Sequence, residues 1–131
     1  MGAGGKCPFC DVAATRILHQ SPLAIAFTDA FPLSRGHSLV IPRRHVASWF
    51  ETTDGERGEM LQLLDEVRET LGKTHRPDGF NIGINDGAAA GQTVPHLHIH
   101  LIPRYAGDVP DPRGGVRRIL PGRADYWSPP R

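Results

Sequence analysis

The spacing of apolar residues along the chain follows two different periods, and each period predicts a different element. Alternation of apolar and polar residues with a period of two predicts short strands. Turn-forming residues such as Pro22, Pro42 and Gly79 separate several of these segments from their neighbours. The predicted strands cover residues 16–20, 23–28, 37–41, 80–85 and 96–102.

A helical period replaces this alternation between the third and fourth predicted strands. Apolar residues recur there at Met60, Leu64, Val67 and Leu71, which predicts one amphipathic helix over about residues 54–73. Thr53 and Glu56 stand at the spacing of a capping box at its start. Residues 45–50 are predicted to form a second, short helix.

The order of these elements, β-β-β-α-β-β, predicts an α+β fold with an antiparallel sheet and its helices on one side. With 131 residues the chain is long enough for one domain but not for two cores. We expect a single domain over residues 1–131. Its core covers about 7–104, and a tail rich in proline, glycine and arginine, 105–131, is expected to be irregular.

Composition narrows the classes of partner. The formal net charge is +1 with neutral histidines, which gives no general electrostatic reason to bind nucleic acid, although a local site for an anionic substrate stays open. No segment approaches the ~20 apolar residues of a membrane span. The N-terminus lacks the apolar region of a signal peptide, so we expect a cytoplasmic protein whose two cysteines are thiols or metal ligands.

The most informative strand is the last one, because it carries a histidine at every second position. His96, His98 and His100 would share one face of the sheet, while the apolar residues between them face a core. A solvent-facing strand gains nothing from three imidazoles, so the pattern indicates chemistry. Two chemical readings stay open: a metal site, which would need further ligands from elsewhere, and nucleophilic catalysis by a neutral imidazole.

The residues leading into this strand separate the two readings. The sequence Gly-Gln-Thr-Val-Pro-His-Leu-His-Ile-His, residues 91–100, resembles the active-site signature of the histidine-triad (HIT) superfamily of nucleotide hydrolases and transferases. The resemblance covers about residues 7–104 and implies a five-stranded antiparallel sheet with one long and one short helix, paired across a homodimer. It also implies that His98 attacks phosphorus and forms a nucleotidyl-histidine that water hydrolyses. His100 would contact the phosphate and assist the leaving group, beside His96.

The resemblance implies a substrate pocket around the triad. Asp29 would accept hydrogen bonds from the ribose hydroxyls, and His37 would lie behind the triad and pass a hydrogen bond toward it. The other residues expected to contact a purine nucleotide line the phosphate or the base; they are Gly91, Gln92, Thr93, Val94, Asn85, Phe9 and Phe27.

Two features of this pocket indicate different substrates. Asparagine at position 85 is similar to the phosphoramidase branch of the superfamily, whereas the glycine-rich lead-in and Pro103-Arg104 are closer to its dinucleotide hydrolases. Dinucleoside polyphosphates and nucleoside phosphoramidates are therefore both expected substrates, each releasing a nucleoside monophosphate. The alternative function is a nucleotide-binding regulatory or scaffold module whose hydrolysis is incidental.

A Cys-x-x-Cys motif near the N-terminus, Cys7 and Cys10, is ambiguous by itself between a redox site, half of a zinc site and free thiols. Zinc-containing members of the superfamily carry the same motif at this place, and their remaining ligands correspond to His45 and His96. The resemblance thus implies a structural zinc ion with two sulfur and two nitrogen ligands.

Overall fold

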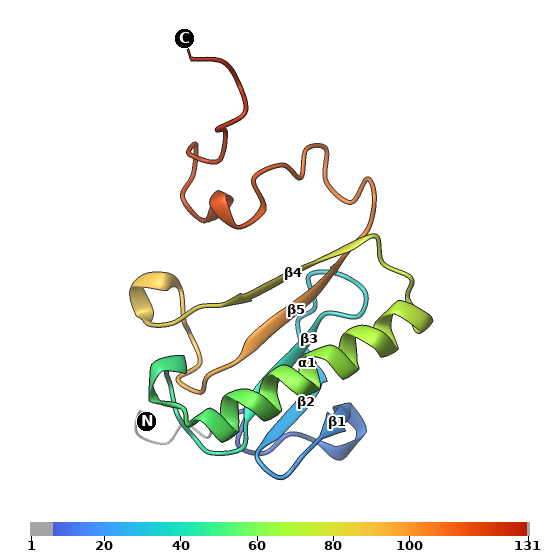
Figure 1. Ribbon diagram of the computed structural model, residues 1–131, viewed down its shortest axis with the longest axis vertical. Coiled ribbons are helices and arrows are strands. Elements are labelled where there is room, and N and C mark those ends of the chain that lie inside the picture. Colours follow the sequence, from blue (N-terminus) through green and yellow to red (C-terminus); the bar gives the residue numbers. More distant parts are fainter. Residues whose placement is uncertain (1–6, 131) are drawn as a thin grey trace.

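The computed structural model describes residues 7–130 and contains one five-stranded sheet whose neighbours are all antiparallel. The strand order is β1-β2-β3-β5-β4, and a single long helix lies against the sheet (Figure 1). The strands are β1 (Ile17–Gln20), β2 (Ala24–Thr28), β3 (Ser38–Pro42), β4 (Gly79–Ile84) and β5 (Ile99–Arg104). The predicted fold class is confirmed.

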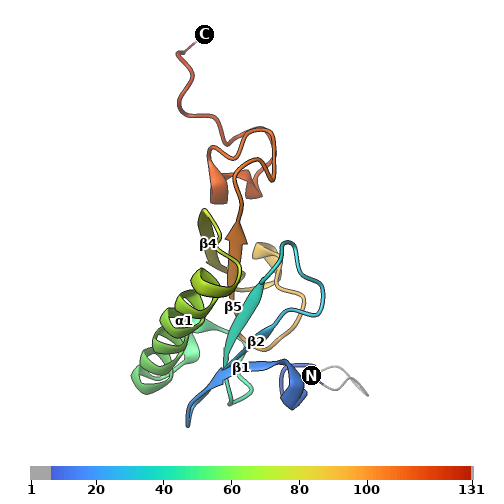
Figure 2. The same ribbon diagram turned by 90° about the vertical axis from the view of Figure 1, so that its right-hand side faces the viewer.

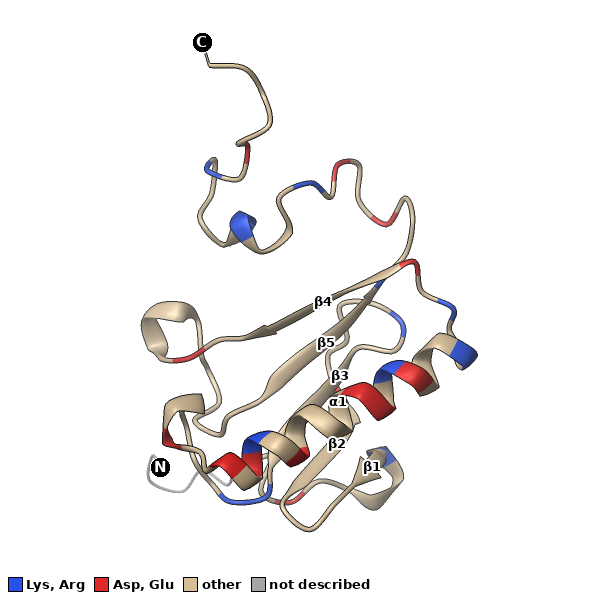
Figure 3. Cartoon of the chain, viewed as in Figure 1, with Lys and Arg blue, Asp and Glu red and all other residues tan. Residues whose placement is uncertain are grey.

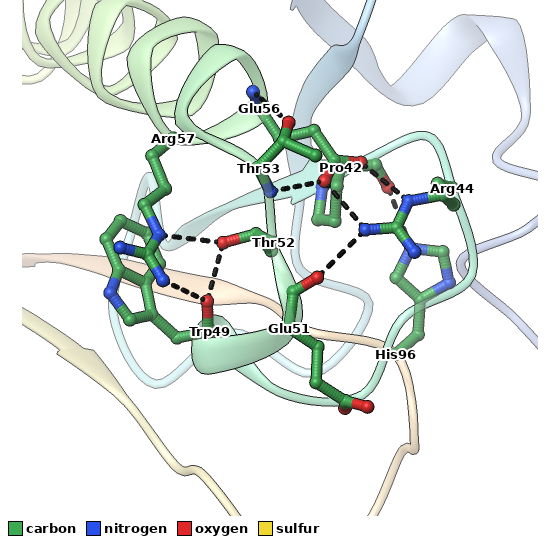
Figure 4. A network of polar contacts seen from close by, with 9 residues as sticks. All are labelled: Pro42, Arg44, Trp49, Glu51, Thr52, Thr53, Glu56, Arg57 and His96. Carbon is green, nitrogen blue, oxygen red and sulfur yellow. Dashed lines mark hydrogen bonds and ion pairs between the residues drawn. The ribbon is translucent and has the colours of Figure 1, made fainter.

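Helix α1 (Asp54–Thr74) covers one face of the sheet (Figure 2). Its predicted capping box is present: the Thr53 hydroxyl accepts from the Glu56 amide, and the Glu56 carboxylate accepts from the Thr53 amide. Arg44 binds the same carboxylate from a neighbouring loop (Figure 4). Met60, Val67 and Leu71 are buried as the spacing predicts, but Leu63 is buried where Leu64 is only partly so. Charged residues follow one another along α1, whereas the strands carry few (Figure 3).

The opposite face of the sheet is covered only in part. Phe27, Leu39 and Ile41 are buried there, with Phe9 and Val12 of the N-terminal segment packed over them. The rest of this face is where the histidines of the lead-in to β5 gather. One face of the sheet therefore packs against α1, and the other carries the histidines.

Two elements differ from the sequence expectation. Strand β5 begins at Ile99, not at residue 96, because Pro95 has no amide hydrogen and the Leu97 amide donates to the Val46 carbonyl at 2.7 Å instead of to a strand. The short helix predicted over 45–50 is a 3-10 turn, η2 (Trp49–Glu51). The Val46 carbonyl accepts from the Leu97 amide, and the Phe50 amide, which would be its donor in an α-helix, donates to the Ser48 hydroxyl instead.

Beyond β5 the chain runs away from the sheet as an irregular tail (Figures 1 and 2). Its one helical segment among the described residues is the 3-10 turn η4 (Gly115–Ile119). Two further 3-10 turns, η1 (Ala14–Arg16) and η3 (Ala88–Ala90), lie in connecting segments. In the part of the chain that is described, no helix has the length and apolar character needed to cross a membrane.

Candidate active site

The three histidines of the predicted motif lie on one side of the chain that enters and forms the start of β5. Leu97, Ile99 and Leu101 are at most 3 % exposed and point into the core beneath α1. The imidazoles point the other way, and the ring centroids of His98 and His100 are 5.0 Å apart. The alternation predicted from the sequence therefore persists, although His96 and His98 precede the strand itself.

His98 has its tautomer set by the backbone. Its Nδ1 lies 2.8 Å from the carbonyl oxygen of His96, which can only accept a hydrogen bond. Nδ1 therefore carries the proton, and the lone pair of the neutral ring is on Nε2. The edge of this ring packs against Phe9, with centroids 5.0 Å apart. The backbone bond and the Phe9 contact therefore fix the orientation of the His98 ring.

A chain of hydrogen bonds sets the tautomer of His100 in the opposite sense. The Leu33 amide donates to Nδ1 of His37 at 3.0 Å, so the neutral His37 ring carries its proton on Nε2. That Nε2 lies 3.0 Å from Nδ1 of His100, which must accept. His100 is left with its proton on Nε2, and this N–H is a hydrogen-bond donor.

Burial keeps the His37 and His100 rings uncharged at neutral pH. Desolvation is the main cause that lowers the pKa of His100 to about 4, and the neighbouring His98 and His37 add to it. Desolvation also lowers the pKa of His37, opposed by the carboxylate of Asp29.

Asp29 follows β2 and contacts both His37 and the loop that begins at residue 30. One carboxylate oxygen accepts from the Phe31 amide at 2.8 Å, and the other lies 3.4 Å from Nε2 of His37. Its side chain is 16 % exposed, so part of the carboxylate faces outward. Asp29 thus has acceptor capacity left for a ligand.

The loop before the histidines offers backbone donors. Gly87 and Gly91 hold φ angles of 96° and 94°, which side chains disfavour. Within the described residues, the amides of Thr93, Val94 and His96 donate to no protein acceptor. Free amides close together in a loop form a site suited to an anion. The Gln92 side chain, in contrast, is occupied by bonds to the amide of Gly87 and to two carbonyls.

A second cluster brings together the four predicted metal ligands. The Sγ atoms of Cys7 and Cys10 and the Nδ1 atoms of His45 and His96 all lie within 4.8 Å of one another. Nε2 of His96 is 2.8 Å from the carbonyl oxygen of Pro42 and donates to it, so its Nδ1 is an unprotonated acceptor facing the thiols. This cluster can hold a metal ion.

Comparison with known proteins identifies the family. The HIT domain model matches residues 11–107. The chain belongs to the HIT family. A Schizosaccharomyces pombe adenosine 5′-monophosphoramidase is 36 % identical over 76 % of this chain and 74 % of its own length. The asymmetrical bis(5′-nucleosyl)-tetraphosphatase of the same organism is 37 % identical over 72 % of this chain and 52 % of its own.

One solved HIT structure contains zinc. The chain is similar to a zinc-bound histidine-triad protein from Mycobacterium smegmatis, with 35 % identity, a TM-score of 0.69 and coverage of 80 % of this chain and 84 % of that one. HIT proteins are nucleotide hydrolases, so the site described above is the candidate active site.

The aromatic residues expected at the HIT pocket differ in exposure. Phe9 is half-buried and touches His98, whereas Phe27 is fully buried beneath it, with ring centroids 5.5 Å apart. A direct contact between Phe27 and a base would require this side chain to become exposed.

Asn85 lies on the other side of the site. It is exposed and, with His100, lines a groove of about 950 Å³ between β4, β5 and the tail. The groove has mainly apolar walls that include Ile82, Val116 and Ile119. It has the size of a pocket for a small molecule.

Sequence reasoning missed the backbone groups that set the ring tautomers: the Leu33 amide and the carbonyls of Pro42 and His96. No residue type could have indicated them, because every residue carries a carbonyl and all but proline an amide.

Proposed function

We propose that this HIT protein hydrolyses nucleoside phosphate derivatives at the α-phosphorus through a nucleotidyl-His98 intermediate and releases a nucleoside monophosphate. The observation that carries the proposal is the bond from Nδ1 of His98 to the His96 carbonyl, because it leaves the lone pair of the neutral ring on Nε2. A module that only binds nucleotides has no use for a ring held in this way.

The steps balance as two displacements. The Nε2 lone pair of His98 attacks phosphorus, and the bond from phosphorus to the leaving group breaks with its electron pair on the leaving group, which takes a proton from solvent when it is an amine. Water then attacks phosphorus, the bond from phosphorus to nitrogen returns its pair to Nε2, and a water proton is released. The free amides of Thr93 and Val94 donate to the phosphate oxygens during both steps.

Asp29 and His100 have complementary roles in this proposal. The outward part of the Asp29 carboxylate accepts from the ribose hydroxyls, and the base packs on the half-buried Phe9. His100 donates its Nε2 hydrogen to the phosphate or to the departing atom. It acts as a neutral donor, since its Nδ1 is occupied by His37.

The groove beside His100 is the proposed place of the leaving group, with Asn85 at its edge. Two arginines line it, but neither is free. Arg104 is held by Asp108 and Asn81, and Arg118 by two backbone carbonyls. With Asp108 and Asp111 also in the wall, the charges balance. We therefore expect a leaving group of low charge, as in a phosphoramidate, to be preferred over a polyphosphate.

The Cys-His cluster is proposed to hold a structural zinc ion. Tetrahedral bonds of about 2.3 Å to sulfur and 2.0–2.1 Å to nitrogen would separate the donor atoms by roughly 3.6 Å. Sγ of Cys7 and Sγ of Cys10 lie 3.3 and 3.6 Å from Nδ1 of His96, and Sγ of Cys10 lies 3.2 Å from Nδ1 of His45. The donor set therefore fits zinc. Bound there, the ion would cross-link the N-terminal segment to the start of the histidine motif.

The deciding experiment is His98→Asn, assayed with adenosine 5′-phosphoramidate and diadenosine tetraphosphate. Turnover of both should fall by several orders of magnitude, while AMP still binds in calorimetry. His19→Asn is the matched control, because His19 bonds only to Thr70 on the helix side. In the unmodified protein, intact-mass measurement of quenched reactions should detect the nucleotidyl adduct. Turnover retained by the His98 variant would support the alternative, a binding module with incidental hydrolysis.

The homodimer implied by the resemblance is likewise part of the proposal, and analytical ultracentrifugation at micromolar concentration tests it. A purine nucleotide is the proposed ligand of each site.

A further inference from the structure

In the loop before the histidines, residues 86–95, hydrogen bonds of Gln92 bring the two ends together. The Gly87 backbone amide donates to the side-chain oxygen Oε1 of Gln92 at 2.8 Å, and the backbone amide of Gln92 donates to the Gly87 carbonyl at 3.1 Å. Gly87 and Gln92 thus pair through two hydrogen bonds, and η3 lies between them.

The other end of this side chain reaches two segments. Nε2 of Gln92 donates to the carbonyls of Ala47 and Val94, at 2.9 and 3.1 Å. Both amide hydrogens are therefore used, and the carbonyl oxygen has a partner as well. A side chain with no donor left cannot also donate to a phosphate without breaking one of these bonds.

Each bond of Gln92 fixes a part of the candidate active site. Because a peptide unit is planar, holding the Val94 carbonyl orients the unit that joins Val94 to Pro95, directly before His96. Holding Ala47 ties the loop to the segment that follows His45. Glutamine at this position is thus the connection between the loop with the free amides and a neighbouring segment.

Asp86 makes a parallel connection at the start of the same loop. One oxygen of its carboxylate accepts from the Ser48 hydroxyl at 3.0 Å and from the Trp49 amide at 2.9 Å. Both ends of the loop are therefore attached to residues 47–49.

We propose that Gln92 is a positioning residue, which holds the free amides of Thr93 and Val94 toward the substrate phosphate by clamping the loop to residues 47–49, and that it makes no contact with substrate. This inference rests on the proposed function for its kinetic tests. It differs from the expectation that Gln92 contacts the substrate, and the tests below decide between the two. We call Gln92 and Asp86 together the loop clamp.

The first test uses the free protein and AMP, with no turnover. Hydrogen exchange at the Gly87 amide should be slow in the unmodified protein and at least tenfold faster in Gln92→Ala. AMP should bind more weakly to that variant. A Gly87 amide that exchanges equally fast in both proteins would overturn the clamp, whether or not the protein proves to be a hydrolase.

The second test separates positioning from contact. Gln92→Ala should lower kcat/KM by about tenfold to a hundredfold, the range expected when reacting groups are slightly misplaced. Asp86→Ala loosens the other end of the loop, so in its background Gln92→Ala should cost clearly less than it does alone. If the two effects multiply, Gln92 acts on substrate independently of the loop, and the proposal is wrong.

The third test uses the conservative variant Gln92→Glu, which keeps the size of the side chain and leaves no cavity. Glutamate keeps the acceptor for Gly87 but turns an ionised oxygen toward two carbonyls, and protonation restores one donor. Gly87 exchange and AMP affinity in this variant, each compared with the unmodified protein at the same pH, should therefore recover as the pH falls. The control Gln62→Glu, an exposed site on α1 with the same change of charge, should show no recovery. The same pH dependence of Gly87 exchange in both variants would contradict the proposal.

Discussion

Glu56 offers the most quantitative test of how the fold supports the site. Its carboxylate is 4 % exposed and receives hydrogen bonds from Arg44 and from the Thr53 amide (Figure 4). Arg44 is the largest cause that lowers the pKa of Glu56 to about 2 from an ordinary value of 4.5. Because Arg44 precedes His45, this pair joins the start of α1 to the segment that carries a candidate metal ligand.

The lowered pKa of Glu56 gives the size of its contribution to the free energy of unfolding. Two and a half pKa units correspond to about 3 kcal/mol of free energy of unfolding. The Arg44 side chain is 53 % exposed, so solvent screens part of this, and about 2 kcal/mol is a reasonable expectation. A lowered pKa means that the unfolded chain binds the proton more readily than the folded one. The stabilisation is therefore complete above about pH 4.5 and is lost as the pH falls toward 2.

Glu56→Gln tests this in urea unfolding at several pH values. The variant keeps an oxygen for the Thr53 amide but loses the charged bond to Arg44. It should be about 2 kcal/mol less stable at pH 7, and the difference should shrink steadily below pH 4.5. Glu69→Gln, which removes an exposed pair with Lys73, is the control and should cost only a few tenths of a kcal/mol. A difference that stays constant with pH would refute the reasoning.

Three further predictions concern the site itself. AMP should bind more tightly than its 2′-deoxy counterpart by about 1.5–3 kcal/mol, and calorimetry of Asp29→Ala should show most of this preference lost; equal affinities in the unmodified protein would exclude the ribose contact. Cys7→Ser should lower the metal content, measured by mass spectrometry, below one ion per chain and reduce stability, with a smaller effect on turnover than His98→Asn. The His100 ring should titrate near pH 4 in NMR spectra because burial disfavours its charged form, and a midpoint near 6.5 would contradict the buried, neutral donor.

Much of the fold could be predicted from the sequence because its local signals agree with one another. The capping box at Thr53 and the 3.6-residue period place α1 to within one residue at its end. The strands are placed to within one to three residues, the largest error being the start of β5. That error came from a period-two pattern that extends beyond the strand: alternation of side chains needs only extended backbone, whereas a strand also needs a paired neighbour.

The sequence predicted which residues lie together at the candidate site better than it predicted what each side chain does there. The structure brings the cysteine pair together with His45 and His96, and it places His37 beside His100 as expected. The sequence could not show that the Gln92 side chain bonds to backbone groups. Its acceptors are the carbonyls of Ala47 and Val94, and every residue carries a carbonyl. Residue type shows which chemistry is possible, but hydrogen-bond partners decide which atom remains available.

The triad illustrates this distinction. By sequence the three histidines are equivalent members of one alternating pattern, yet each uses a different nitrogen. A carbonyl accepts the Nε2 hydrogen of His96 and leaves Nδ1 facing the cysteines, and another accepts the Nδ1 hydrogen of His98 and leaves the lone pair on Nε2, where the proposed mechanism places the nucleophile. His100 faces an N–H donor instead of a carbonyl, so its remaining nitrogen carries the proton and donates. A hydrogen-bond donor in place of a backbone acceptor moves the lone pair of the ring to the other nitrogen. Identical side chains two residues apart can therefore take the three different roles that the proposed function gives them: metal ligand, attacking group and phosphate contact.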